Sequence, residues 1–156
     1  MAQGGLDHFI SKGLPLESSY PYRGVNGVCK VLPAGTFFKK ISTYVEVAPG
    51  NMLSYIANLA QRPMTTSFFV VDDFFDYASG EFDANVDCSG IPARTNHAVL
   101  AVGFDLTAAK PYVKFKNSWG ATWGDAGFFK LPIKKDIFQN GPCNMIRLHR
   151  AFYPKV

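Results

Sequence analysis

The spacing of apolar residues changes at Pro63, and this change limits the folds open to the chain. Before Pro63, apolar residues recur at helical spacing over 6–12 and 51–61, and Gly13 and Arg62-Pro63 end these segments. After Pro63, four short runs rich in Val and aromatic residues follow, at 64–71, 97–104, 112–119 and 128–133. Two helices followed by four or more strands predict an α+β fold, with a small helical part first and an antiparallel sheet or barrel second.

The composition agrees with a packed globular protein. Of the 156 residues, 47% are apolar and only 18% are charged, which excludes a disordered chain, a collagen and a coiled coil. A chain of this length can bury a sizeable core. Residues 14–45 are rich in Pro, Gly and Tyr without any sustained period, so we expect them to form an ordered loop region of a larger body.

The charges give little support for a nucleic-acid or membrane partner. The net charge is only +4 and is not gathered into a basic stripe. Residues 72–87 hold six acids and no base, whereas residues 110–156 hold nine bases and two acids, which indicates solvated loops and strand faces or, alternatively, a surface that steers a charged partner. The sequence contains neither a membrane-spanning apolar run nor a signal peptide, so we expect any targeting signal to lie outside these residues.

A histidine and an asparagine are expected to meet across a hairpin. If 97–104 and 112–118 pair around a loop near residue 108, the numbers of opposite residues sum to about 216. His97 then lies opposite Trp119 and diagonal to Asn117, within about 5 to 8 Å. An amide oxygen that accepts from one imidazole nitrogen fixes the tautomer and leaves the other nitrogen for proton transfer. A single histidine in a strand is more often structural, so the pair alone does not decide the function.

Longer stretches of the sequence indicate the function more specifically. The segments NHAVLAVGF, KNSWGATWGDAGFF and GLPLESSYPYRG, together with Gly4-Gly5, resemble the papain-like cysteine peptidases in order and spacing. The resemblance covers nearly the whole chain, up to the FYP at 152–154. It implies a papain-like fold with an active cleft between two domains: an incomplete helical domain at 1–46, a β-barrel domain at 47–151 and a tail at 152–156 that returns to the helical domain.

The same resemblance implies roles for individual residues. His97 would be the catalytic histidine, Asn117 its orienting partner and Trp119 the aromatic shield over their hydrogen bond. The residues implied to contact substrate are Gly4, Gly5, Ser67, Asn96 and Ala98, with Ser67 in the main specificity pocket and Asn96 where many members have Asp. No cofactor and no metal are implied. The stretches around Ser67 and His97 favour different cathepsin sub-families, which leaves the sub-family open.

The nucleophile of this chemistry is expected outside these residues. In the family the reactive cysteine stands in C-G-[SA]-C-[WY], about 130 to 150 residues before the histidine and asparagine, which places it at roughly position −33. The glutamine of the oxyanion hole precedes it and is absent as well. None of the three cysteines of this chain stands in such a motif. We therefore interpret the sequence as the carboxyl-terminal portion of such a peptidase.

The three cysteines receive structural roles from the resemblance. Cys88 and Cys143 match a pair that the family joins in a disulfide across its β domain; two buried thiols are the alternative. Cys29 matches a half-cystine whose partner lies upstream, so we expect it to be unpaired here. The odd number of cysteines is then explained by the missing segment and not by catalysis.

Two functions agree with these features of the sequence. The first is the His/Asn-bearing portion of a cysteine endopeptidase that is inactive by itself, with peptide or protein substrates, the missing Cys-bearing segment or chain, and inhibitors of the cystatin type as partners. By family resemblance such a protein is lysosomal, vacuolar or secreted. The second is a catalytically dead papain-like homologue that serves as a binding or structural protein. A generic basic β-rich binding module would leave NHAVLAVGF and KNSWG unexplained.

Overall fold

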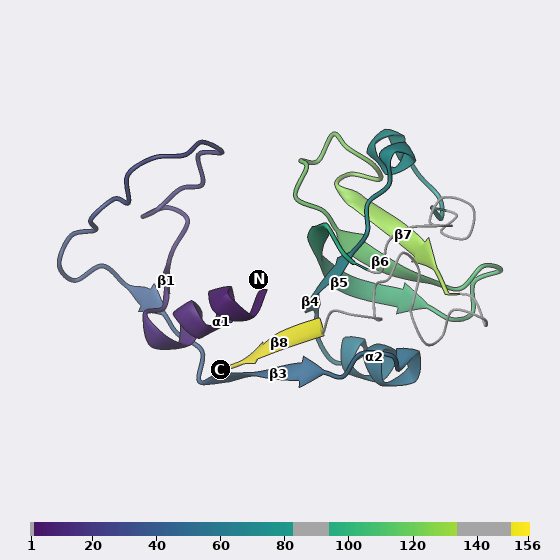
Figure 1. Cartoon of the computed structure of the whole chain (residues 1–156), viewed down its shortest axis with the longest axis horizontal. Coiled ribbons are helices and arrows are strands. Elements are labelled where there is room, and N and C mark those ends of the chain that lie inside the picture. The colour runs from purple at the N-terminus through teal and green to yellow at the C-terminus, as the bar shows by residue number, and fades with distance from the viewer. Residues whose placement is uncertain (1, 83–93, 134–150) are drawn as a thin grey trace. The chain divides into compact units, whose positions relative to one another are not determined.

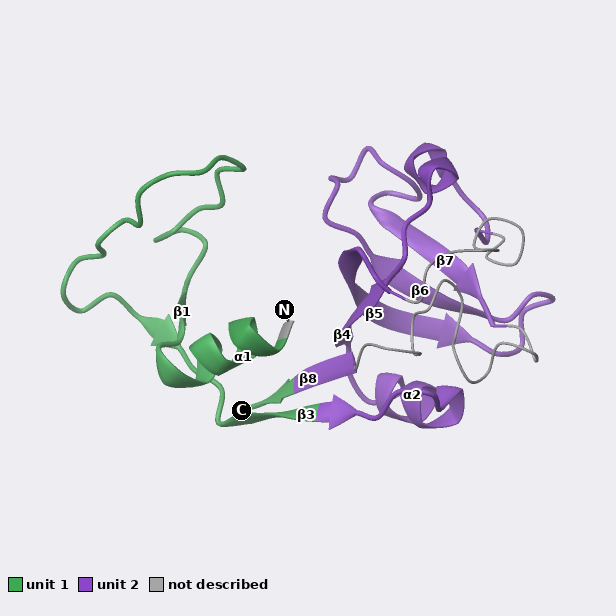
Figure 2. Cartoon of the chain, viewed as in Figure 1, with its two compact units in different colours: residues 1–45, 154–156 green, residues 46–153 purple. Residues whose placement is uncertain are grey.

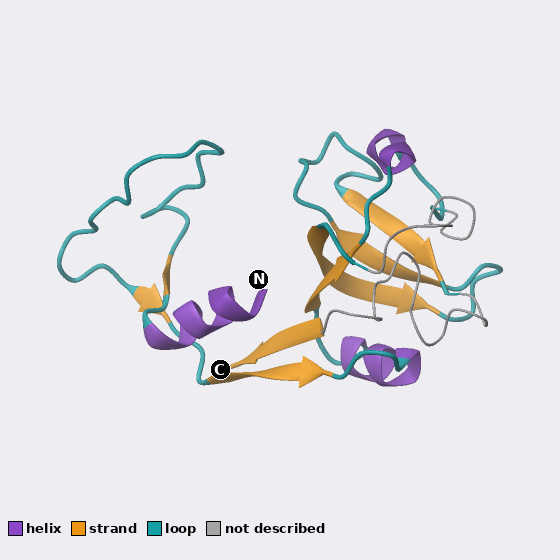
Figure 3. Cartoon of the chain, viewed as in Figure 1, coloured by secondary structure: helices purple, strands orange, loops and turns teal. Residues whose placement is uncertain are grey.

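The computed structural model describes residues 2–82, 94–133 and 151–156 (Figure 1). In these ranges two α-helices and a 3-10 helix lie among eight strands (Figure 3). The elements are α1 (Ala2–Ser11), β1 (Leu14–Pro15), β2 (Phe38–Lys39), β3 (Thr43–Val47), α2 (Met52–Leu59), β4 (Met64–Phe68), η1 (Asp72–Asp76), β5 (His97–Asp105), β6 (Tyr112–Lys116), β7 (Phe128–Pro132) and β8 (Ala151–Lys155). The predicted α+β class is confirmed, with both expected helices and all four expected strands present.

The described residues fall into two compact units (Figure 2). Unit 1 comprises Met1–Val45 and Pro154–Val156, and unit 2 comprises Glu46–Tyr153. The division expected from the sequence, into domains at 1–46 and 47–151 with a tail at 152–156, stays a prediction. Strands β3 and β8 each begin in one unit and end in the other.

Six strands form the main sheet, in the order β3-β8-β4-β5-β6-β7. The pairs β4–β5, β5–β6 and β6–β7 are antiparallel, as predicted. The expected sum of 216 holds for Leu100↔Lys116 and Ala101↔Phe115, but the register shifts by one residue beyond a bulge between Ala101 and Gly103. Closure of this sheet into a barrel remains a prediction.

The core of unit 2 lies on one face of the sheet. Alternate residues of the central strands point to this face and are almost fully buried: Met64, Phe68, Ala101, Val113, Phe115, Phe129 and Leu131. Such alternation is what a sheet with one covered face requires. Phe115 and Phe129 stack at 4.9 Å across the β6–β7 pair. Helix α2 lies near β5 and buries Met52, Tyr55, Ile56 and Leu59.

Side-chain hydrogen bonds set several limits of the elements. Asn51 caps α2, because its Oδ1 accepts the N–H of Ser54 at 2.9 Å. Strand β4 ends at Phe68 rather than at the predicted residue 71, since the backbone of Val70 bonds instead to the side chain of Asn96. Strand β6 ends at Lys116 rather than at 119, since the Asn117 N–H donates to Gly127 O at 2.9 Å.

The C-terminal tail and the acidic segment adopt structure that the sequence did not predict. Residues 151–155 form β8, which lies between β3 and β4 and pairs Phe152 with Thr65. Residues 72–76 of the acidic segment form η1, in which Phe74 is buried. In the described parts of the chain, no helix is long and apolar enough to cross a membrane.

Candidate active site

His97 and Asn117 are brought together at the ends of two paired strands. His97 is the first residue of β5, and Asn117 directly follows β6. The register near this end of the pair is the predicted one. The expected contact is present: His97 Nε2 lies 2.8 Å from Asn117 Oδ1. Asn117 is 8% exposed, so the bond forms at the border of the core.

A second hydrogen bond fixes which nitrogen of His97 carries the proton. Asn117 Oδ1 also accepts the backbone N–H of Ser118, at 2.8 Å. The amide cannot be turned around, because Nδ2 would then face this N–H donor. Oδ1 is therefore the atom that meets the imidazole, and His97 Nε2 must be the donor. The neutral ring then holds its lone pair on Nδ1, which is the atom left for proton transfer.

The loop after Asn117 depends on left-handed glycines. The N–H of Gly127 donates to Trp123 O at 2.8 Å, and Gly127 O in turn accepts the N–H of Asn117. Gly124 has φ +59, and a Cβ placed there would lie 2.7 Å from Phe128 O and 3.2 Å from the ring of Tyr77. Only glycine fits such a position. The WG of the sequence thus shapes the loop that holds Asn117.

Aromatic rings cover the histidine. The Trp119 ring lies 5.0 Å from the His97 ring, so the side chain expected as the shield stands beside the hydrogen bond. The Phe68 ring meets His97 from the neighbouring strand at 5.9 Å. Both rings pack against the imidazole, and a hydrogen bond is stronger in such a less polar surrounding.

The sequence did not predict that two further aromatic residues, Phe75 and Trp123, contact Trp119. The ring of Phe75 stacks on Trp119 at 5.0 Å with only 5° between the planes. Trp123 meets Trp119 edge to face at 4.9 Å, and its Nε1–H donates to Phe75 O at 2.9 Å. The available signal was the pair Phe74-Phe75 within an acidic segment. One of these rings is buried in the core and the other, 57% exposed, lies against Trp119.

Burial and nearby charges shift the pKa of one tyrosine, Tyr77, beside these aromatic rings. Burial raises the pKa of Tyr77 above its usual value, and the carboxylates of Asp125 and Glu81 act in the same direction. The Tyr77 hydroxyl donates to Gly80 O at 2.6 Å. Tyr77 therefore stays neutral at physiological pH and serves as a packing residue of the loop.

The residues expected to contact substrate near His97 fall into two groups. Ser67 and Ala98 are directly opposite each other on β4 and β5, and their side chains point to the face of the sheet opposite to that of His97. The structure thus brings these two together, as a common pocket requires. Asn96 uses its side chain differently: its Oδ1 accepts the Val70 N–H at 2.7 Å and its Nδ2 donates to Val70 O at 3.0 Å.

The other candidate residues lie elsewhere or outside the described residues. Gly4 and Gly5 are exposed on α1 of unit 1, and nothing lies within 4 Å of a Cβ placed on either. Cys29 is an exposed free thiol of unit 1. Cys88 and Cys143 belong to segments 83–93 and 134–150, which lie outside the described residues, so their disulfide stays a prediction. Within the described ranges, no group of three His, Cys, Asp or Glu side chains could hold a metal ion.

Comparison with known proteins supports the chemistry that this geometry suggests. Residues 2–150 match the family described as papain family cysteine protease. The chain is 40% identical over 132 residues to cysteine proteinase 3 of Solanum lycopersicum, covering 84% of this chain and 36% of that protein. It is 37% identical over 133 residues to pro-cathepsin H of Medicago truncatula, covering 85% and 37%. The chain thus spans little more than a third of the length of these relatives.

Comparison of the fold with solved structures indicates the same family. The structure of the bromelain protease from Ananas comosus superposes with a TM-score of 0.78 at 29% sequence identity, covering 97% of this chain and 67% of that chain. The chain belongs to the papain family of cysteine proteases.

Proposed function

We propose that this chain is the His/Asn-bearing portion of a cysteine endopeptidase whose nucleophilic cysteine lies outside these 156 residues. The observation that carries the proposal is the 2.8 Å bond between His97 Nε2 and Asn117 Oδ1 under the ring of Trp119. It leaves Nδ1 of His97 free for a thiol. Cys29 is not proposed as that thiol, because it stands in no nucleophile motif.

The proposed reaction uses Nδ1 of His97 twice. Nδ1 takes the proton of the cysteine thiol, and the thiolate stays paired with the imidazolium. The thiolate attacks the peptide carbonyl, and as the C–N bond breaks, Nδ1 returns the proton to the leaving amine. Nδ1 then removes a proton from water, whose oxygen displaces the thiolate from the acyl carbon. Asn117 keeps Nε2–H bonded throughout and so holds the ring in one orientation.

The substrate contacts and partners follow from the same proposal. Ser67 and Ala98 are proposed to line the pocket for one substrate side chain, and their pairing across β4 and β5 supports this role. Gly4, Gly5 and the backbone beside Asn96 are proposed to contact an extended peptide. Inhibitors of the cystatin type and a lysosomal, vacuolar or secreted location are further expectations for the complete enzyme.

The test begins with the purified chain and a peptide substrate. We expect no measurable hydrolysis, since loss of one member of such a catalytic unit can reduce the rate about a millionfold. Turnover by this chain that thiol alkylation leaves unchanged would contradict the proposed mechanism. The purified Cys29→Ser variant is the matched control, because its behaviour must equal that of the parent.

The second step uses the native material. The bromelain structure contains the inhibitor E64, so we expect an E64-derived label to attach to a cysteine outside these residues. Intact mass would show whether that cysteine stands on the same or on a second polypeptide. Replacement of His97 by Ala should abolish labelling without unfolding unit 2. If native material of this chain stays unlabelled, the alternative holds, namely a papain-like homologue that binds partners without catalysis.

A further inference from the structure

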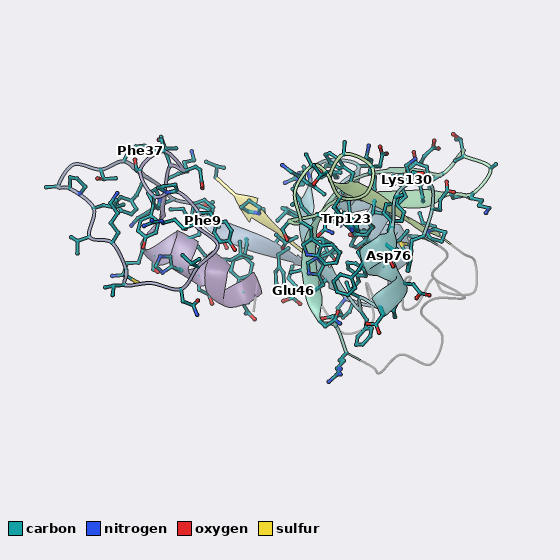
Figure 4. All side chains as sticks on the ribbon, turned by 90° about the horizontal axis from the view of Figure 1, so that it is seen from above. Phe9, Phe37, Glu46, Asp76, Trp123 and Lys130 are labelled. Atoms are coloured by element: carbon teal, nitrogen blue, oxygen red, sulfur yellow. The ribbon has the colours of Figure 1, made fainter. Side chains whose placement is uncertain are left out.

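The outer face of the main sheet carries three lysine side chains that the proposed reaction does not use. Lys114 and Lys116 stand on β6, and Lys130, labelled in Figure 4, stands on β7. They alternate along these strands with buried residues, so they point away from the core of unit 2. Lys116 is exposed, and Lys114 and Lys130 are half-buried. We call these three residues the lysine face.

The register places two of these lysines against each other. Lys114 lies directly opposite Lys130 in the β6–β7 pair. Like charges at directly opposite positions of a sheet destabilise it. None of the three lysines forms an ion pair within the part of the chain that the structure describes. Two ammonium groups held at such a position attract an anionic ligand.

Aromatic rings hold these two ammonium groups in place. Lys114 Nζ lies 4.8 Å from the centre of the Phe128 ring, and Lys130 Nζ lies 4.7 Å from the centre of the Tyr112 ring. Both contacts run diagonally across the β6–β7 pair, so the two lysines lean in opposite directions along the strands. A side chain that is already held loses less conformational freedom when a ligand binds. Because an ammonium group covers one face of each ring, these contacts favour recognition by charge over stacking of a sugar on the ring.

Two carboxylates lie at the border of the lysine face. The Oδ1 atom of Asp105 accepts hydrogen bonds from the N–H and the hydroxyl of Thr107, both at 2.8 Å, and from the N–H of Ala108 at 3.0 Å. Glu81 pairs with Lys130 through an isolated backbone bridge. Neither carboxylate forms an ion pair with the lysine face among the described residues. The ammonium groups therefore keep a charge that a partner can meet.

The lysine face continues the surface that is proposed to contact substrate. Ser67 and Ala98 are opposite each other on β4 and β5, and their side chains point to the same face of the sheet as the three lysines. The next outward residue of the ladder on β5, Leu100, lies directly opposite Lys116. Two residues along β5, about 6.8 Å, and one strand spacing, about 4.8 Å, thus separate Ala98 from Lys116. All these residues belong to one sheet, in unit 2.

We propose that the lysine face binds an acidic segment of a protein substrate, next to the pocket at Ser67 and Ala98. This inference rests on the proposed function and adds a class of substrate to it. Alternate side chains of an extended peptide are about 6.8 Å apart, as are Lys114 and Lys116 on β6, so carboxylates at every second residue can meet both ammonium groups. A substrate with such a segment is held at two places, which strengthens its binding without any change at the reacting bond.

The first experiment measures binding to the full chain and does not depend on catalysis. The probe is a fluorescent ten-residue peptide in which Glu and Thr alternate, and the reference peptide has Lys in place of Glu. Fluorescence anisotropy should show binding of the acidic peptide at least about tenfold tighter than binding of the reference, and added salt should weaken it. Lys114→Gln/Lys116→Gln should weaken this binding about tenfold, because two charged contacts are lost.

Two further variants control for loss of charge and for loss of packing. Lys12→Gln/Lys39→Gln removes the same charge from exposed lysines of unit 1 and should change binding by less than about twofold. Lys116→Gln alone should weaken binding about threefold. Lys116 contacts no aromatic ring among the described residues, so this single variant decides the question even if the double variant is less stable.

The second experiment asks whether the bound segment belongs to a substrate. A peptide that the native enzyme cleaves is extended by the acidic repeat at its amino end or at its carboxyl end. At one of these ends the repeat should lower KM at least about fivefold and leave kcat unchanged, because the added contact holds substrate and transition state alike. Lys116→Gln in the native enzyme should reduce this effect on KM.

The outcomes separate the lysine face from the catalytic proposal. Equal binding of the acidic and the reference peptide, or equal binding by the double variant and the parent, overturns the lysine face. So does lysine-dependent binding of dextran sulfate without binding of the acidic peptide, because a polysaccharide is then the ligand. A repeat that leaves KM unchanged at both ends also overturns the proposal.

E64 labelling of the native material gives the other arm of the test. Lysine-dependent binding of the acidic peptide by material that takes no E64 label supports the lysine face as a peptide site and contradicts the proposed function. A label without lysine-dependent binding supports the function and overturns the lysine face.

Discussion

At the scale of single residues, Asn117 performs two tasks with one oxygen. Oδ1 accepts the N–H of Ser118 and so anchors the amide to its own backbone. The same atom accepts Nε2–H of His97 and so orients the ring. The meeting of His97 with Asn117 could be predicted from cross-strand arithmetic, since it depends only on register. The second bond, from Ser118, could not be predicted, because it depends on the conformation of the turn.

The neutral ring of His97 should carry its proton on Nε2, because the atom that meets this nitrogen is Asn117 Oδ1, which can only accept. The ¹⁵N NMR spectrum of the parent chain at high pH measures this. Replacement of Asn117 by Ala removes the acceptor, so the variant should lose the preference for the proton on Nε2, whereas the spectrum of His8 on α1 should not change. A proton on Nδ1 in the parent, or an unchanged tautomer in the variant, would contradict the assignment.

Replacement of Gly124 by Ala should lower the free energy of unfolding of unit 2 by about 3 kcal/mol or more. The left-handed φ of +59 and the 2.7 Å approach to Phe128 O both act against a methyl group. Gly80→Ala separates the two causes, since Gly80 has φ +79 but nothing within 4 Å of its Cβ. That variant should lose only about 1 to 2 kcal/mol. Chemical denaturation measures both, and equal losses would show that the close contact has no effect.

At the scale of elements, helical spacing, residue type and turn residues carried most of the prediction. The two helices were found because their apolar residues repeat at helical spacing, and the four strands because Val and aromatic residues gather in short runs between turn residues. The strands β3 and β8 and the 3-10 helix η1 were not found, since each is held by partners distant in sequence. For β8 that partner is Thr65, whose Oγ1 donates to Phe152 O at 3.2 Å. A five-residue tail carries no periodic signal of such a contact.

The side chain of Asn96 binds Val70, in the link between β4 and η1, and a substitution of Asn96 tests this contact. Its amide both accepts from and donates to Val70, so Asn96→Asp loses the donor and places a carboxylate against a carbonyl. We expect unit 2 to lose about 1 to 3 kcal/mol at neutral pH. A protonated carboxyl group restores the donor, so the pKa of this Asp should be raised in the folded state. Its stabilising effect is then complete below the unfolded pKa of about 3.9 and disappears as pH rises through the folded pKa.

Denaturation of this variant at several pH values measures the effect. The difference from the parent should shrink toward pH 4 and below. Asn96→Ala is the matched control, because it loses both hydrogen bonds at every pH and its difference from the parent should not narrow in acid. A constant difference for Asn96→Asp would contradict the role of the Nδ2 donor. Hydrogen exchange at the Val70 amide gives a local reading of the same bond.

At the scale of the whole molecule, the two units differ in the side-chain packing that stabilises them. Unit 2 has a core of aromatic rings in contact: Phe68 meets Phe74 edge to face, Phe74 meets Phe129 edge to face, and Phe129 stacks on Phe115. Unit 1 has α1, the two-stranded β1–β2 hairpin and the segment between these strands, with hardly any buried side chain among its described residues. The sequence predicted an ordered loop region of a larger body for residues 14–45. The sequence could not show whether these residues are buried, because an exposed apolar loop and a covered one have the same composition.

Limited trypsin digestion of the chain should therefore cut unit 1 first. Local opening costs little free energy where few side chains are buried, whereas cleavage within β6 or β7 requires unit 2 to unfold. We expect cuts after the exposed Arg23 and Lys30 of unit 1 to be at least about a hundredfold faster than cuts after Lys114 of β6. A fragment that begins at Ile41, after a cut at Lys40, and keeps unit 2 should survive and melt at the temperature of the intact chain, since the aromatic core remains whole. Cuts after Lys114 as fast as those after Arg23, or a fragment that melts much earlier, would show that unit 1 contributes stability that its exposed side chains do not account for.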